Sequence, residues 1–319
     1  MGVRYVAWGK ESTYQAAVAA VRYFEATENV KGVPNFDVPE PVASPDYRVW
    51  GPDAWRYKGD VGPFKVPPDV LGDVLSMVFG LPSTTNPSAG VYLHSFAPLD
   101  TLPSYTIRRG LELTESVLAG CLGNSLSLKI NRKENALMAS LGVLQGYPEA
   151  SNTIKTESQL NSLLSPYVPF PFDSPSTYLI SGVENKTLMY DLAVSLNNNF
   201  SEEGNLDSSS LTQKRKRHRD VTGTISLCFD NTTERDRFLA GNPFGLDVTV
   251  YGPIIASTYR YSLRLQLPRC RYIEDALPHV KTQKEDLKIP NAPFRAFYDT
   301  AGSFNASIKV ALQNAVVSY

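Results

Sequence analysis

Two stretches of the sequence, RYKGDVGPFKV (residues 56–66) and DVTGTISLCF (residues 220–229), share one pattern and decide the fold. Each reads as a strand anchored by a glycine, and in each case a segment with the pattern of a helix follows. The anchoring glycines, Gly59 and Gly223, are 164 positions apart (223 − 59), about half of the 319-residue chain. A strand–helix–strand unit repeated at this spacing predicts two similar modules in tandem, an arrangement that suits symmetric assembly better than an active site.

The segments after these strands carry the clearest helix patterns. The first predicted helix covers residues 69–79 with Asp69 as its N-cap, because apolar residues recur on one helix face: Leu71, Val74, Leu75 and Val78. The second covers residues 232–240 and begins at Asn231 or Thr232, both of which are residue types that cap helices. A glycine follows each helix, as is common at helix C-termini.

Alternating apolar and polar residues predict strands in both halves of the chain. The expected strands cover residues 55–66, 105–113, 125–130, 137–144, 188–196, 221–229, 246–250, 261–267 and 303–312. Many strands with about one helix in each half predict a mainly β fold with a few helices. We expect two tandem β-sandwich or barrel modules, each with a packed α-helix.

Proline-rich stretches divide the chain. Residues 34–45 hold four prolines, so we expect the first 45 residues to form an arm around a module or a neighbouring subunit, although residues 16–26 have a helix-forming composition. Five further prolines interrupt a polar segment in the middle of the chain. The expected division is an N-terminal arm (1–45), a first module (46–147), a linker (148–176) with a short helix at 158–164, and a second module (177–319).

The composition excludes several classes of protein. Hydrophobic residues make up 42% of the chain, which allows a packed core, and the net charge of −1 gives no basic excess of the kind that duplex-DNA binders show. Three widely spaced cysteines predict neither a disulfide framework nor a zinc site. The sequence has no recognisable signal peptide and no run of 18 apolar residues. We therefore expect a reduced, soluble protein made in the cytosol, without cofactor, metal or membrane contact.

Residues that could carry catalysis are sparse. The three histidines, His94, His218 and His279, are far apart in the sequence, and His94 is expected in a loop. No G-x-S-x-G, P-loop or HExxH motif is present. We expect no catalytic residues and no enzyme activity. A carbohydrate-active β-sandwich stays open as a third class, because the pair of carboxylates that such chemistry needs cannot be read from one sequence.

The long loop of residues 197–219 is the candidate contact site. It joins two alternating strands and far exceeds the length of an ordinary hairpin loop, and long loops on rigid sheets usually carry function. A basic run at 214–219 could bind nucleic acid or an acidic surface, or simply be solvated near the acidic residues of the same loop. We expect contacts between subunits or rings from Asn198, Phe200, Glu202, Glu203, Lys214, Arg215, Lys216 and Arg217.

Several short blocks resemble the major tail tube proteins of siphovirus-type bacteriophages. The opening WGKESTY (residues 8–14) is similar to the glycine–acid–x–x–tyrosine start of that family, although Gln15 stands where glycine is usual. The segment of residues 59–80 also resembles the family. So do HSFAP (94–98) before SYTI (104–107), and FLAG (238–241) before LRLQLPR (263–269).

This resemblance implies a structural virion protein that forms stacked rings around a lumen, a conduit for DNA delivery. Members with one module per chain form six-fold rings, so two fused modules imply three chains per pseudo-six-fold ring. The implied partners are further copies of the chain, the tape measure protein and the tail terminator, with DNA passing the lumen without specific binding. The protein would be made in the host cytoplasm and end in the virion tail. The alternative is another virion β-sandwich, such as a capsid, decoration or baseplate protein.

Overall fold

The computed structural model describes residues 4–24, 31–37, 51–131, 136–144, 147–152, 154–167, 169–170, 176–184, 189–200, 218–274, 288–300 and 304–319. These residues form 18 strands and three helices, which confirms the expectation of a mainly β fold with a few helices. In the described part of the chain, no helix is long and apolar enough to cross a membrane.

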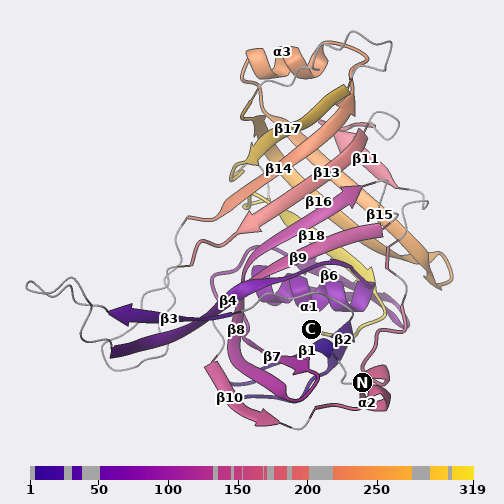
Figure 1. Cartoon of the computed structure of the whole chain (residues 1–319). Coiled ribbons are helices and arrows are strands. Elements are labelled where there is room, and N and C mark those ends of the chain that lie inside the picture. The colour runs from indigo at the N-terminus through magenta and orange to yellow at the C-terminus, as the bar shows by residue number, and fades with distance from the viewer. Residues whose placement is uncertain are drawn as a thin grey trace, which may run out of the picture.

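The elements fall into two series that follow one another along the chain (Figure 1). The first series is β1 (Arg4–Lys10), β2 (Arg22–Phe24), β3 (Lys31–Asp37), β4 (Gly51–Lys65), α1 (Pro68–Phe79), β5 (Ser83–Ser88), β6 (Val91–Phe96), β7 (Tyr105–Leu111), β8 (Glu115–Asn131), β9 (Ala136–Leu144) and β10 (Tyr147–Asn152). After α2 (Glu157–Asn161), the second series is β11 (Thr177–Ile180), β12 (Val183–Glu184), β13 (Met189–Asn197), β14 (Asp220–Cys228), α3 (Thr233–Leu239), β15 (Phe244–Ala256), β16 (Tyr259–Tyr272), β17 (Lys288–Ala296) and β18 (Lys309–Asn314).

The two series have the same strand pairing. In the first, β1 pairs with β7, β7 with β8 and β8 with β10, while β3 pairs with β4, β4 with β9 and β9 with β8. In the second, β11 pairs with β15, β15 with β16 and β16 with β18, which repeats the first set of pairs. The other set is repeated by β13 pairing with β14, β14 with β17 and β17 with the end of β16. Only the β5–β6 hairpin of the first half lacks a counterpart among the described strands. The chain is therefore a topological duplication, as the glycine spacing predicts.

The register of the two leading hairpins agrees with the spacing of 164 residues. Lys31 pairs with Lys58 in the β3–β4 hairpin, and Ser195 pairs with Thr222 in the β13–β14 hairpin. Ser195 comes 164 positions after Lys31 (195 − 31), and Thr222 comes 164 positions after Lys58 (222 − 58). The anchoring glycines occupy equivalent positions, because each lies opposite a buried residue of the next strand. The pairs are Gly59 with Val143, and Gly223 with Phe294.

The two halves share one continuous sheet, which we call the wall sheet: β3–β4–β9–β8–β13–β14–β17. Its halves meet where residues 125–131 of β8 pair with β13, for example Leu126 with Leu196. A second contact joins them where β6 of the first half pairs with β18 of the second. Figure 1 looks onto the wall sheet, with β17, β14 and β13 side by side and β15 crossing behind them.

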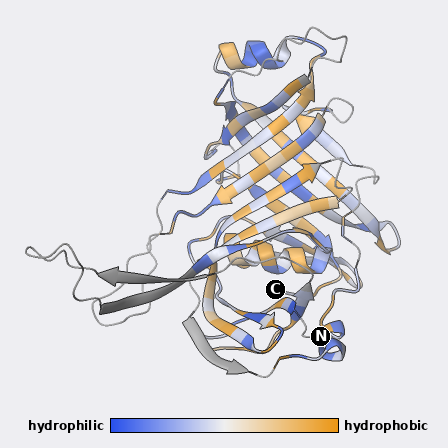
Figure 2. Ribbon diagram, in the orientation of Figure 1, coloured by the Kyte–Doolittle hydropathy of each residue, from blue (hydrophilic) through white to orange (hydrophobic). Residues whose placement is uncertain are grey.

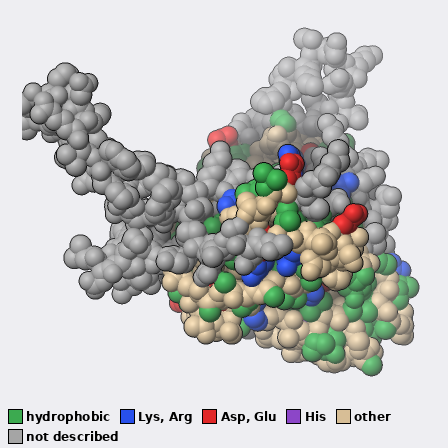
Figure 3. Space-filling view, turned by 60° about the horizontal axis from the view of Figure 1, so that its bottom comes forward, with side chains coloured by type: hydrophobic (Ala, Val, Ile, Leu, Met, Phe, Trp, Pro, Cys, Tyr) green, Lys and Arg blue, Asp and Glu red, His purple; other side chains and the backbone are tan. Residues whose placement is uncertain are grey.

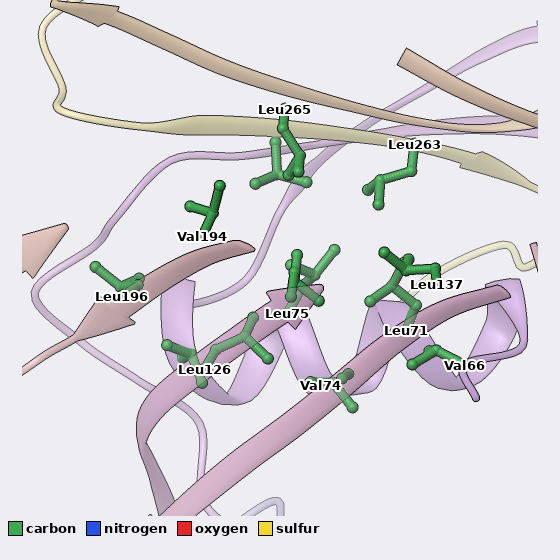
Figure 4. Close-up of a cluster of buried hydrophobic side chains, with 14 of the residues drawn as sticks. Val66, Leu71, Val74, Leu75, Leu126, Leu137, Val194, Leu196, Leu263 and Leu265 are labelled. Atoms are coloured by element: carbon green, nitrogen blue, oxygen red, sulfur yellow. The ribbon is translucent and has the colours of Figure 1, made fainter. Parts of the chain in front are cut away.

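One hydrophobic core fills the space between the wall sheet and a second layer made of α1, β1, β6, β7, β10, β11, β15, β18 and parts of β8 and β16. In Figure 4, Leu75 of α1 and Leu126 of β8 lie in the same cluster as Val194 of β13 and Leu263 of β16. Each such side chain stabilises the fold by about 1.5–3 kcal/mol when it is fully buried. Because the cluster takes residues from both halves, the two modules are not separate bodies.

The first predicted helix is confirmed, but its cap is wrong. Pro67 occupies the N-cap position and Pro68 the first helical position, so Asp69 lies inside the first turn. There Asp69 is buried and accepts a hydrogen bond of 2.6 Å from Ser165 Oγ. At α3, Thr232 is the N-cap residue without a capping side-chain bond, and Asn231 Oδ1 accepts from the backbone N–H of Thr233 instead.

The predicted N-terminal arm needs correction where the structure describes it. Residues 4–10 form β1, which pairs along its whole length with β7, and Trp8 is fully buried. Residues 16–24 contain no helix, because Val21 N–H bonds to Trp8 O and β2 pairs with β1. Tertiary pairing overrides the helix-forming composition here. The expected linker likewise begins with β10, and its helix α2 is held by a capping box between Thr156 and Gln159.

Candidate assembly interface

The outer edge of β3 is the clearest unused pairing surface. β3 pairs with β4 on one side, and none of the described strands pairs with its other side. Its counterpart β13 pairs with β14 on one side and with β8 on the other. The repeat therefore assigns to β3 a partner equivalent to β8, and no strand among the described residues occupies that position.

Backbone directions on the two strands are equivalent as well. Asn198, just after β13, donates its backbone N–H to Asn124 O of β8. Because the N–H groups of alternate residues in a strand point the same way, the N–H of Leu196 also faces β8. Shifted by 164 positions, Leu196 corresponds to Gly32 of β3. The N–H of Gly32 therefore points to the open edge.

A complementary edge lies at the end of β16. Arg271 and Tyr272 pair with β17 as Leu122 and Gly123 of β8 pair with β9. Beyond them, Ile273 N–H continues the ladder to Pro293 O, and the Ile273 side chain is exposed. No other described strand pairs with this end of β16. The end of β16 thus corresponds to the part of β8 directly before the residues that pair with β13.

The start of the long loop is anchored inside the chain. Asn198 is only 1% exposed, and its Nδ2 donates to Val78 O at the end of α1 (2.9 Å) and to Gly123 O (3.4 Å). An unpaired buried amide would cost about 1–3 kcal/mol, so these bonds fix the loop's point of departure. The structure places Asn198 as an internal anchor, where the sequence suggested a contact residue.

The two ends of the loop are tied to each other. Asn199 adopts a left-handed conformation (φ +49°), and its Nδ2 donates to His218 O and to Asp220 Oδ2. Phe200 is partly exposed and donates its N–H to Asn124 Oδ1. The other predicted contact residues lie outside the described residues: Glu202, Glu203, Lys214, Arg215, Lys216 and Arg217.

The WGKESTY block forms a turn around a buried carboxylate. Glu11 accepts bonds from Ser104 Oγ (2.6 Å), Thr106 Oγ1 (2.8 Å), Gly120 N (2.7 Å) and Gln15 N (3.0 Å). Charge-assisted bonds of this kind are stronger than neutral ones. Glu11 thus ties the turn at residues 12–15 to β7 and β8, which explains why an acid follows the glycine here. The sequence does not indicate the partners on Ser104, Thr106 and Gly120, because they lie 93–109 residues away.

Gln15 keeps the turn that a glycine usually makes. Its φ is +64°, in the left-handed region that is unfavourable for residues other than glycine, asparagine and aspartate. The turn expected from the resemblance is therefore present, at the cost of a strained residue. Tyr14 beside it is 38% exposed, and desolvation of its hydroxyl raises the pKa of that group to about 12.

His94 is a structural residue in a strand, not a loop residue. It is fully buried in β6, with Nδ1 2.8 Å from Thr84 Oγ1 and Nε2 2.9 Å from Val316 O. Burial lowers the pKa of its imidazole, which favours the neutral ring. Among the described residues, no group of three or more His, Cys, Asp or Glu side chains could hold a metal ion, and the three cysteines are not joined by a disulfide.

Charged side chains are scattered on the surface. Figure 3 shows Lys, Arg, Asp and Glu dispersed among neutral side chains over the described part of the face in view. Over the described residues of this one face, the charges form no basic stripe of the kind that grips a nucleic acid.

Comparison with known proteins agrees with this architecture. A family model described as "Phage tail tube protein" matches residues 5–295, which is most of the chain. No curated protein matched the sequence.

Proposed function

The chain belongs to the phage tail tube protein family, and we propose that it assembles into stacked rings that form the DNA-delivery tube of a siphovirus-type phage. The observation that carries this proposal is the β8–β13 junction between two halves of equal topology. A junction already made once within the chain can be made again between chains, because β3 repeats the edge of β13 and β16 ends directly before the residues that correspond to the β8 edge.

Such a contact is heterologous, since one copy offers its first half and the next copy its second. Heterologous contacts build closed rings when the rotation between units divides a full turn. If six halves close the ring, three chains suffice and the symmetry is pseudo-six-fold. Closure also covers the β3 edge, which would otherwise be a template for aggregation.

The other expected partners follow from the tube. The tape measure protein would occupy the lumen during assembly, and the tail terminator would cap the last ring. We expect the loop of residues 197–219 to contact a neighbouring ring. Its two ends are joined where Asn199 Nδ2 donates to Asp220 Oδ2. The protein would be made in the host cytoplasm before it joins the virion tail.

Proline substitution at the open edge tests the proposal. Gly32→Pro removes an N–H that points away from β4, so the β3–β4 hairpin keeps its bonds while the outer ladder loses a donor. We expect the parent chain to form rings or tubes under electron microscopy, and Gly32→Pro to sediment as a monomer. Gly32→Ala, which keeps the N–H, is the matched control and should assemble.

Three results would count against the proposal. The parent chain could remain monomeric at high concentration, even with other tail components supplied. It could form shells or lattices, which would favour a capsid, decoration or baseplate role. Finally, Gly32→Pro could assemble as well as Gly32→Ala, which would place the contact elsewhere.

A further inference from the structure

Part of the second layer is a sheet with one face away from the core, which we call the outer sheet: β11–β15–β16–β18–β6. Its core-facing residues are apolar and buried: Val248, Val250, Leu263, Leu265, Val310 and Leu312. Hydrophobic and more hydrophilic positions alternate along β15 and β16 in Figure 2. The residues between the buried ones therefore point away from the core.

A hollow of about 510 Å³ lies on this outward face, and we call it the outer hollow. Its middle is low because short side chains, Thr249 of β15 and Ala311 of β18, stand opposite Arg264 of β16 on either side. Two tyrosines, Tyr251 and Tyr259, line it near the β15–β16 turn. Its volume falls in the range of about 300–1,000 Å³ that is typical of sites for small molecules.

The β5–β6 hairpin completes the outer hollow. This hairpin belongs to the first half and is the element without a described counterpart in the second. Its strand β6 extends the outer sheet beyond β18 and contributes Leu93 to the lining. Tyr259 Oη lies 3.5 Å from Pro87 O of β5, a contact across 172 positions of the chain. The one asymmetric element of the repeat is thus used to build a hollow.

The equivalent face of the first half is covered by the chain itself. There the outward residues of β1 pack against α2 and the segment before it, in a small cluster of Tyr5, Ala7, Leu160, Ala20, Tyr23 and Ile154. The backbone of Val18 lies over β7, since its N–H bonds to Thr106 Oγ1 (3.0 Å) and its O accepts from Arg108 Nε (3.0 Å). In the first half this position is therefore filled by polypeptide.

The second half offers a different chemistry at the same position. Among the described residues, only the strands of the outer sheet and the β15–β16 turn line the outer hollow. Where β1 presents apolar side chains, this face presents hydroxyl, carboxylate, guanidinium and amide groups, for example on Thr249, Ser262, Asp247, Arg264 and Gln313. An apolar polypeptide cover would bury these groups without partners, which is costly. A polar, hydroxylated occupant matches them.

The polar groups of the hollow are held in place. Arg264 binds Asp247 with a fork of two bonds, Nε to Oδ1 (2.9 Å) and Nη2 to Oδ2 (2.6 Å). Gln266 Nε2 donates to the same carboxylate (3.2 Å). Such paired planar groups offer donors and acceptors side by side in a fixed geometry. Neighbouring hydroxyls of a sugar ring, each a donor and an acceptor, fit this arrangement.

The tyrosines and the charge balance narrow the class of ligand. A sugar ring has apolar C–H faces between its hydroxyls, and an aromatic side chain such as Tyr251 offers an apolar surface with a polar tip. A phosphate is a poorer match, because the charge of Arg264 is already balanced by Asp247, whose carboxylate repels an anion.

We infer that the outer hollow binds a saccharide unit. Asp247 and Arg264 hydrogen-bond its hydroxyls, and Tyr251 packs against its ring. The inference goes beyond the proposed function, because a single chain carries the complete site. On a tube, many copies of a weak site would act together on a surface coated with the same glycan, which raises the overall affinity without any new contact.

A glycan array, probed with labelled protein at a concentration where sedimentation shows monomers, tests the inference. The parent should bind one group of related glycans, and isothermal titration with the best of them gives its Kd. Tyr251→Ala removes the stacking surface and Ala311→Trp fills the hollow from a position that points away from the core. Each should raise the Kd about tenfold or more.

The matched control is Tyr298→Ala, which removes a tyrosine that is 59% exposed and lies outside the outer hollow. It should bind the glycan as the parent does. Circular dichroism shows whether each variant keeps the fold, and because the two test variants change the hollow in opposite ways, a folding defect in one leaves the other as the test.

Three results would overturn the inference. The parent could bind no glycan above the level of Ala311→Trp, both test variants could bind as the parent does, or inorganic phosphate could displace the glycan at millimolar concentration, which would indicate an anion site. Electron microscopy of concentrated parent protein tests the proposed function separately. Glycan binding without tubes would leave the saccharide site standing, and tubes without glycan binding would overturn only the site.

Discussion

At the residue scale, the two anchoring glycines show how a sequence repeat becomes a structural one. A Cβ on Gly223 would lie 2.4 Å from Phe294 Cζ and 2.4 Å from Ala193 O, so only glycine lets the Phe294 ring cross the strand. The spacing of Gly59 and Gly223 could be read from the sequence. The close approach that requires Gly223 could not, because Phe294 is 71 positions away (294 − 223).

Gly223→Ala should therefore destabilise the fold. Overpacking of this kind costs about 1–3 kcal/mol, and urea denaturation of the monomer measures it. The control is Gly245→Ala, whose nearest contact would be 3.2 Å from Pro268 O and whose cost should be smaller. Equal stability of Gly223→Ala and the parent would show that Phe294 moves aside freely.

The Glu11 carboxylate makes a second residue-scale prediction. Glu11→Gln keeps the side-chain shape but loses the charge and turns an amide N–H₂ toward donors such as Gly120 N. Removing charge-assisted bonds should lower the free energy of unfolding by about 1.5–3 kcal/mol. Thermal unfolding monitored by circular dichroism provides the measurement. An unchanged midpoint would mean that the turn does not depend on this carboxylate.

At the element scale, local patterns predict elements correctly, whereas pairings over long range escape them. The helix α1 follows from its apolar periodicity, α3 follows from the capping residue types before it, and a glycine follows each helix. The strand β1 was missed because its partner β7 is about 100 residues away and its own run, RYVAWGK, alternates poorly. The open edge of β3 likewise appears only when its pairing is compared with that of β13.

The contact between α1 and β2 predicts a pH dependence. Burial raises the pKa of Asp73 on α1 to about 7, opposed by Arg22 of β2, whose Nε lies 3.6 Å from Asp73 Oδ2. Trp8 and Lys10 also favour its ionised form, and Asp69 disfavours it. A raised acid pKa means that the folded state holds the proton more tightly, so stability falls as pH rises from about 4 to about 7.

Asp73→Asn should remove this dependence. Relative to the parent, the variant's free energy of unfolding should therefore increase from pH 4 to pH 7, that is, the variant becomes relatively more stable. Urea titrations at several pH values measure this difference. The control Asp236→Asn changes an exposed carboxylate of α3 and should leave the profile of the parent unchanged. Parallel profiles for Asp73→Asn and the parent would show that Asp73 is not the group responsible.

At the scale of the whole molecule, duplication and fusion are the central features. The mainly β fold and the repeat could be predicted from the sequence, since both depend on local pattern. The shared core could not, because it depends on which strands of the two halves meet. Under the proposed function, the open edge of β3 and the end of β16 are the two edges through which neighbouring chains would join into a ring.

The number of chains in a ring tests this account most directly. Native mass spectrometry of isolated rings, combined with the symmetry of end-on views in electron microscopy, gives both the copy number and the number of lobes. The account predicts three chains and six similar lobes. Six chains per ring, or lobes that do not come in equivalent pairs, would contradict it.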